Sequence, residues 1–184
     1  MSQEAGVLAA TDRRRLRWIR TWIVVLMAGL VVSGVTAFPL DRELAAASVV
    51  LHHSALASVS PDLLTWVDKV SLGLAVTYRA YPFVAYGTDW LAFAHLVIAV
   101  AFIGPLRDPV RNVWVLVWGM IACVGVIPLA LIAGAVRGLP LGWQLIDISF
   151  GVVGIVPLIA AYILTRLLER SPRPSETAGT SDGG

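Results

Sequence analysis

The sequence has little charge and a single cysteine, and both shortages exclude classes of protein. Only 14% of the 184 residues are charged, whereas 58% are hydrophobic. A soluble domain carries about 25% charged residues, so a surface that mostly faces water is excluded. Cys123 is the one cysteine and lies within an apolar stretch. An internal disulfide, CxxC redox chemistry and covalent c-type haem are therefore excluded.

Glycine-rich loops that cradle phosphates are also missing, and arginine supplies almost all of the positive charge. The arginines cluster near the ends of apolar stretches. That distribution suits lipid headgroups and membrane topology and does not suit nucleic acid. We expect the lipid bilayer as a partner, with a homo-oligomer or a larger membrane complex as further partners and no nucleic acid.

Four long apolar stretches, at about 21–40, 90–106, 113–136 and 141–164, are what the sequence has in abundance. Each is close to the length of about 20 residues that an α-helix needs to cross a bilayer. They predict an all-α integral membrane protein with a four-helix transmembrane bundle. We expect one membrane domain at 21–170, a basic cytoplasmic tail at 1–20, and a disordered cytoplasmic tail at 171–184.

The region 41–88, between the first two stretches, is less hydrophobic and predicts an amphipathic helical cap outside the cytoplasm. Its triplet Ser-Pro-Asp at 60–62 has a capping hydroxyl, a proline and an early acid, which are typical of a helix start. Apolar residues then recur at helical spacing, which indicates a helix on the membrane surface or over the bundle. They are Leu63, Trp66, Val67, Val70 and Leu74. A shorter helix at 41–56, with His52 and His53, precedes this one.

Positive charge also predicts the orientation. The side without the termini has four positive residues, namely Arg42, Lys69, Arg79 and Arg137. The other side has ten, namely Arg13, Arg14, Arg15, Arg17, Arg20, Arg107, Arg111, Arg166, Arg170 and Arg173. Because cytoplasmic segments carry the excess of Lys and Arg, we predict a multi-pass protein of the cell (inner) membrane with both termini cytoplasmic.

The first stretch has a second interpretation. Its end, Val-Thr-Ala at 35–37, fits the small-residue pattern of a signal-peptide cleavage site. The apolar core is long for a signal peptide, which favours a retained span. Cleavage and retention both stay open.

Asp147 lies inside the fourth apolar stretch, where an ionisable side chain is costly unless it has a partner. It is six residues from the outer end, or about 9 Å, and His95 on the second stretch has a similar depth. Gln144 precedes Asp147 on the same helix face, and Asp89 lies above His95. We therefore predict a polar cluster or ligand site in the outer leaflet. Its residues are His95, Asp147, Asp89, Gln144, Tyr86 and Trp90.

Several interpretations of this cluster stay open. Asp147 can pair with His95 or Arg137 as a structural clamp that contributes about 0.6–2 kcal/mol. It can be a counter-ion or proton acceptor with His95 as its partner. A metal site would combine His95, Asp147 and His53, since histidine and carboxylate bind zinc or iron. Bis-histidine haem needs two histidines on facing spans. It is excluded within the bundle because only one histidine, His95, lies in an apolar stretch. We expect no cofactor, with a metal or a haem as alternatives.

For function, we predict a non-catalytic polytopic membrane protein that binds a small or lipidic ligand under its cap or serves as an accessory module. The first alternative is an outward-facing membrane enzyme that uses Asp147 and His95 as acid and base or as metal ligands. The second is an oligomeric proton-coupled carrier.

Small residues and one polar turn have structural interpretations. The pairs Gly29/Ser33, Gly134/Gly138 and Gly151/Gly154 predict close contacts between helices. The triplet Arg-Asp-Pro at 107–109 predicts a charge-paired turn whose proline starts the third helix.

Overall fold

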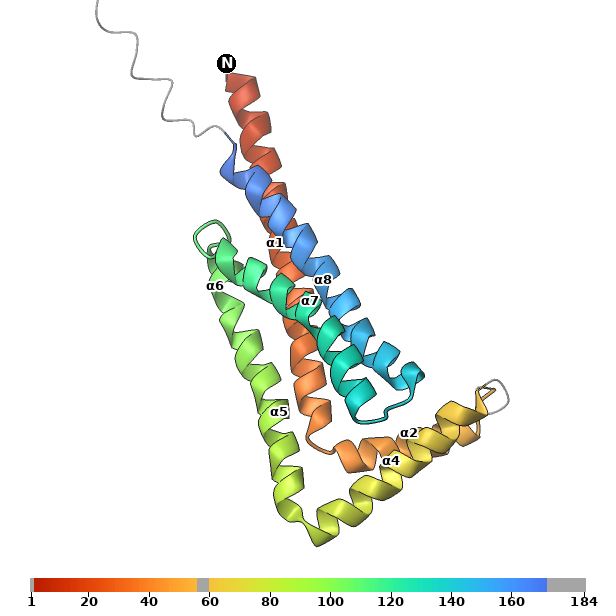
Figure 1. Ribbon diagram of the computed structural model, residues 1–184. Coiled ribbons are helices and arrows are strands. Elements are labelled where there is room, and N and C mark those ends of the chain that lie inside the picture. Colours follow the sequence, from red (N-terminus) through yellow and green to blue (C-terminus); the bar gives the residue numbers. More distant parts are fainter. Residues whose placement is uncertain (1, 56–59, 172–184) are drawn as a thin grey trace, which may run out of the picture.

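The computed structural model describes residues 2–55 and 60–171, and helices form nearly all of this part. Their bounds are α1 (Ser2–Ala37), α2 (Leu40–His52), α4 (Pro61–Ala80), α5 (Pro82–Ala101), α6 (Ile103–Arg107), α7 (Val113–Val136) and α8 (Leu141–Glu169) (Figure 1). The described residues contain no strand. Four helical stretches are long and apolar enough to cross a membrane, namely Ala9–Ala37, Pro82–Arg107, Val113–Val136 and Leu141–Glu169. The predicted all-α class with four membrane spans is confirmed.

Helix α1 is the central element of the bundle. It packs against α5 on one side and α8 on the other, and α7 packs along α8. Helices α2 and α4 pack against each other as a hairpin that lies across the ends of the spans, far from the N-terminus (Figure 1). The C-terminal end of α8 returns to the end of the bundle where α1 begins (Figure 1). The molecule thus has a terminal end and a cap end.

The hydrophobic core lies toward the terminal end. Its buried residues come from α1, α7, α8 and the α5–α6 junction, and they are Ile19, Ile23, Phe102, Val115, Leu116, Leu158 and Ala161. Gly119 on α7 allows the closest approach in this core. A Cβ atom added there would lie 2.9 Å from Phe102 and 3.1 Å from Leu158. The ends of the Phe102 and Leu158 side chains therefore occupy the space beside residue 119, which has no side chain of its own.

Two further glycines permit backbone contact between spans. A Cβ atom at Gly151 would lie 2.5 Å from the carbonyl oxygen of Cys123, which confirms the predicted close contact there. Gly34 on α1, which was not among the predicted contact glycines, has the same role toward α5. A Cβ atom added at Gly34 would lie 2.9 Å from the Ala92 carbonyl oxygen. The close contact predicted at Gly29 is wrong, since nothing lies within 4 Å of its added Cβ.

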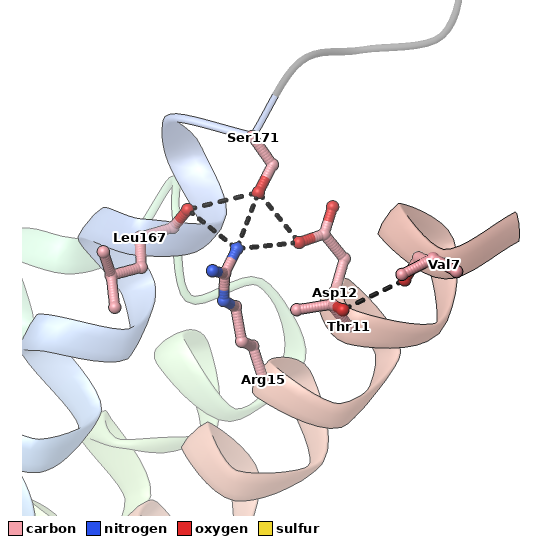
Figure 2. A network of polar contacts seen from close by, with 6 residues as sticks. All are labelled: Val7, Thr11, Asp12, Arg15, Leu167 and Ser171. Atoms are coloured by element: carbon pink, nitrogen blue, oxygen red, sulfur yellow. Dashed lines mark hydrogen bonds and ion pairs between the residues drawn. The ribbon is translucent and has the colours of Figure 1, made fainter. Parts of the chain in front are cut away.

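The basic N-terminal segment is helical, because helix α1 already begins at Ser2, and its cytoplasmic location stays a prediction. Arg15 fixes this part of the helix to the end of α8 (Figure 2). Its Nη1 donates to Asp12 Oδ1 at 3.1 Å, to Ser171 Oγ at 2.9 Å and to the Leu167 carbonyl oxygen at 3.4 Å. The Ser171 hydroxyl also donates to Asp12 at 2.8 Å. Beyond Ser171, the predicted disordered tail lies outside the described residues.

Two other boundaries differ from the sequence expectation. The helix of the second span begins at Pro82 rather than near residue 90, because Pro82 occupies the first helical position and the aromatic segment that follows is helical. Helix α7 begins at Val113, and not at the proline of the polar turn. In that turn Asp108 Oδ1 accepts from the Arg111 backbone N–H at 3.1 Å, and Asn112 Nδ2 donates to the Gly104 carbonyl oxygen at 3.2 Å.

Candidate functional site

The two helices of the cap hairpin are joined by a polar cluster. The Ser48 hydroxyl donates to Asp68 Oδ1, and His52 Nε2 lies 3.0 Å from Asp68 Oδ2. The hydrogen bond from Ser48 is the main reason why the pKa of Asp68 falls below its ordinary value of 3.8, with His52 acting in the same direction. The His52 and Asp68 side chains are about half exposed. His52 therefore serves the hairpin and does not face the bundle.

None of the five apolar residues that the sequence places on one face of α4 is exposed. Val67 is buried, and the other apolar residues of that face are partly buried. At the N-terminal part of this face, the Trp66 ring meets Trp143 of α8 edge to face, with 6.4 Å between ring centres. Lys69 Nζ lies 5.4 Å from the centre of the Trp66 ring. This pair of indoles joins the cap to the start of the fourth span.

A cavity of about 560 Å³ opens where α4 and α8 meet at these indoles. Its lining combines an acid, a base, two hydroxyls and apolar surface, and it consists of Ser60, Asp62, Leu63, Thr65, Trp66, Lys69, Pro140, Gly142 and Trp143. Trp66 Nε1 is buried without a hydrogen-bond acceptor in the described part of the chain. Ser60 is the N-cap of α4, yet its hydroxyl makes no capping hydrogen bond. Two polar groups of the lining thus keep unused hydrogen-bonding capacity.

Asp147 continues this site into the span. It follows Trp143 by four residues, so both lie on the same face of α8. The side chain is partly buried, and among residues 2–55 and 60–171 it has no hydrogen bond or ion pair. Gln144 behaves differently. Its buried side chain lies against Gly134, and Nε2 donates to the Leu139 carbonyl oxygen at 2.9 Å. Gln144 therefore closes the α7–α8 turn and is not available to a ligand.

His95 lies on the other side of α1. Its Nδ1 is 2.9 Å from the Leu91 carbonyl oxygen of its own helix, and its Cβ is 3.1 Å from the Cβ position of Gly34. Helices α5 and α8 each pack against α1 and make no comparable contact with each other in the described chain. No hydrogen bond or ion pair joins His95 to Asp147 there. The pairing of these two residues stays a prediction without geometric support.

The remaining predicted site residues lie on α5. Tyr86 and Trp90 are 61% and 59% exposed and meet edge to face at 6.1 Å, and Trp90 meets Phe93 in the same way. This row of rings is an exposed aromatic face of a span and does not line the cavity. Asp89 is partly buried and has no partner among the described residues.

The described residues do not assemble the predicted metal site. No three His, Cys, Asp or Glu side chains of residues 2–55 and 60–171 gather closely enough to hold a metal ion. His53 is exposed at the C-cap of α2. His95 makes the contact with its own helix described above. The metal interpretation therefore has no geometric support in this part of the chain.

The cavity residues of α4 and α8 were not part of the predicted site. One signal for them was present in the sequence, because Trp143 lies one helical turn from Asp147. A second was Trp66 on the apolar face of the cap helix. What the sequence did not contain was the contact between the two indoles, which depends on how α4 lies across the bundle.

Comparison of the chain with protein-family models, with curated proteins and with solved structures gave no significant match. The class of protein follows from the fold itself. Four apolar helices of spanning length, with α1 at their centre, define a polytopic α-helical membrane protein.

Proposed function

We propose that this polytopic protein is a non-catalytic membrane module that binds an amphiphilic ligand, small or lipidic, in the cavity between α4 and α8. In the predicted orientation the cavity opens at the outer leaflet of the cell membrane. The observation that carries the proposal is the buried Trp66 N–H without an acceptor at a cavity that the Ser60 hydroxyl, which makes no capping hydrogen bond, also lines.

The Trp66 indole N–H requires that the ligand carry a hydrogen-bond acceptor. A buried donor without an acceptor costs about 1–3 kcal/mol. An oxygen of a ligand head supplies that acceptor once the Trp66 ring turns toward the cavity. Lys69, held over the same ring, favours an anionic or strongly polar oxygen at this position. A phosphate or carboxylate group meets both conditions.

The rest of the lining gives the ligand its amphiphilic character. Leu63 and Trp143 offer apolar surface next to the polar lining residues. Tryptophan is enriched where one end of a ligand or lipid is wet and the other is apolar. Asp147, one turn below Trp143 and without a partner, offers a counter-ion for a cationic or hydrogen-bond-donating group. A zwitterionic head with a single apolar chain matches this distribution.

The test uses lysophosphatidylethanolamine with a fluorescent acyl chain and the full-length protein in nanodiscs. Trp66→Phe keeps an aromatic ring and removes the N–H. We expect it to weaken binding about tenfold, as the loss of one charge-assisted hydrogen bond does. Trp114→Phe on α7 is the matched control because Trp114 is 64% exposed and does not line the cavity, so its affinity stays unchanged.

Two results would overturn the proposal. One is binding of equal strength in the unsubstituted protein and in Trp66→Phe while both remain folded. The other is the absence of saturable binding in the unsubstituted protein. His95→Ala serves as a further discriminator. It leaves ligand binding unchanged in this proposal, whereas the acid–base and metal alternatives require it to remove their activity or metal content.

A further inference from the structure

A stripe of basic and aromatic side chains follows one face of α1 at the terminal end. Arg14, Arg17, Trp18 and Thr21 recur at the spacing that places residues on a single helix face. They border an open surface hollow of about 420 Å³. All four are exposed. The guanidinium groups of the two arginines have no hydrogen-bond or ion-pair partner in the described part of the chain, and the Thr21 hydroxyl donates to the Arg17 carbonyl oxygen at 3.1 Å.

This stripe lies opposite the face that holds the bundle together. At about 100° per residue, Ile19 and Ile23 point about 170° away from the centre of the stripe, and both are fully buried in the core. Arg15 lies off the stripe and is used in the network with α8 (Figure 2). Arg15 therefore has a structural role on one side of the helix, whereas the guanidinium groups of Arg14 and Arg17 on the other face make no hydrogen bond or ion pair within the described chain.

The same face continues into the apolar part of the span. Val25 and Val32 follow Thr21 at helical spacing, and they are 52% and 61% exposed. A molecule that occupies the stripe thus meets two arginines and an indole first and an uninterrupted apolar strip next. That order of surfaces is the order of groups along a phospholipid, from head to acyl chain.

We propose that the Arg14–Arg17–Trp18–Thr21 face is a binding site for an anionic phospholipid of the leaflet that contacts the terminal end. The guanidinium groups of Arg14 and Arg17 donate to the phosphate and to the second anionic or hydroxyl group of the head. The Trp18 ring lies beside the glycerol region. The acyl chain follows Val25 and Val32. The continuous apolar strip favours a lipid over an acidic soluble partner, which has no use for it.

The site is independent of the ligand cavity, since it lies at the other end of the molecule and shares no residue with it. The proposed site also predicts a preference that depends on particular residues, in addition to the general attraction of basic residues for a membrane. Other exposed arginines at the same end, such as Arg13 and Arg170, lie outside this face and carry the non-specific share of that attraction.

The experiment uses Trp18 as a reporter in proteoliposomes of phosphatidylcholine and phosphatidylglycerol. Either lipid carries bromine atoms near the glycerol end of its chains, and the Trp18 signal is the difference between the unsubstituted protein and Trp18→Phe. We expect brominated phosphatidylglycerol to quench Trp18 more strongly than brominated phosphatidylcholine at equal mole fraction. The corresponding preference is up to about thirtyfold for two arginines near an anionic head. Equal quenching by the two lipids overturns the proposal without any arginine substitution.

The arginine test then separates a site from charge alone. R14Q/R17Q removes two charges from the stripe, and R13Q/R170Q removes two charges from the same end outside it. We expect the preference for phosphatidylglycerol to disappear in the first variant and to persist in the second. An equal loss in both variants would show that overall charge explains the preference, and the site would be withdrawn.

Discussion

In the interior of the terminal end, buried side chains pack closely and polar groups have partners, whereas at the cap end Trp66 and Asp147 have none in the described chain. The unpaired arginines Arg14 and Arg17 of the terminal end lie on its outer surface. The core residues gather around Phe102 at the terminal end, and Arg15 there contacts three groups at once. At the cap end, Trp66 Nε1 and Asp147 lack partners among the described residues. The interior of the terminal end is therefore closed, whereas the interior of the cap end keeps unused binding capacity.

The difference indicates that, in this membrane protein, the core that stabilises the bundle and the cavity that can bind a ligand lie at opposite ends. Lipid tails are as apolar as leucine, so the spans gain little from hydrophobic burial and depend on close packing. The glycine contacts at residues 119 and 151 provide that packing. The cap, by contrast, touches the fourth span through two indoles at an open cavity. A ligand that completes this contact would add stability to it.

Among substitutions that test the difference between the two ends, we expect the largest change in the free energy of unfolding at Gly119. Gly119→Val forces a branched side chain into the space between Phe102 and Leu158. Overpacking of this kind lowers the free energy of unfolding by about 1–3 kcal/mol. The control is Gly125→Val on the same helix, where an added Cβ meets nothing within 4 Å. Thermal unfolding in detergent checks both, and equal destabilisation would contradict a tightly closed terminal end.

The next effect has the opposite sign and lies at the cap end. Asp147→Leu removes an unpaired carboxyl from an apolar span and raises the free energy of unfolding by about 1 kcal/mol, a fraction of the insertion cost of a central aspartate. The same variant loses affinity for lysophosphatidylethanolamine. Measuring unfolding and ligand binding on one preparation checks both the gain in stability and the loss of affinity. A destabilised Asp147→Leu would instead indicate that this carboxyl is a structural clamp.

The amino-acid sequence predicts the elements well and their mutual rotation poorly. Span length, the start of the cap helix at Pro61 and the apolar face around Val67 all follow from local patterns. The four spans are apolar on every side, so no periodicity indicates which face meets a neighbour. Equal depth therefore suggested a pairing of Asp147 with His95, although α1 packs between their helices. The contact between Trp66 and Trp143 was hidden for the same reason.

The smallest expected effect is the response of the cap hairpin to pH. The hydrogen bond from Ser48 lowers the pKa of Asp68 below 3.8, and His52 adds to the shift. Because the folded state favours the carboxylate, the stabilisation is complete above pH 3.8 and is lost as pH falls through the lower folded-state pKa.

Hydrogen exchange in α2 and α4, corrected for intrinsic rates, checks this response, with protection expected to fall only at the acid end. Asp68→Asn has no carboxyl to titrate and should show reduced protection that does not change with pH in that range. Asp62→Asn, on the same helix and without a partner among the described residues, should keep the transition of the unsubstituted protein. An unaltered transition in Asp68→Asn would assign the acid sensitivity to another group. The hairpin would then be held by apolar packing alone, and the cap end would differ from the terminal end even more than its contacts indicate.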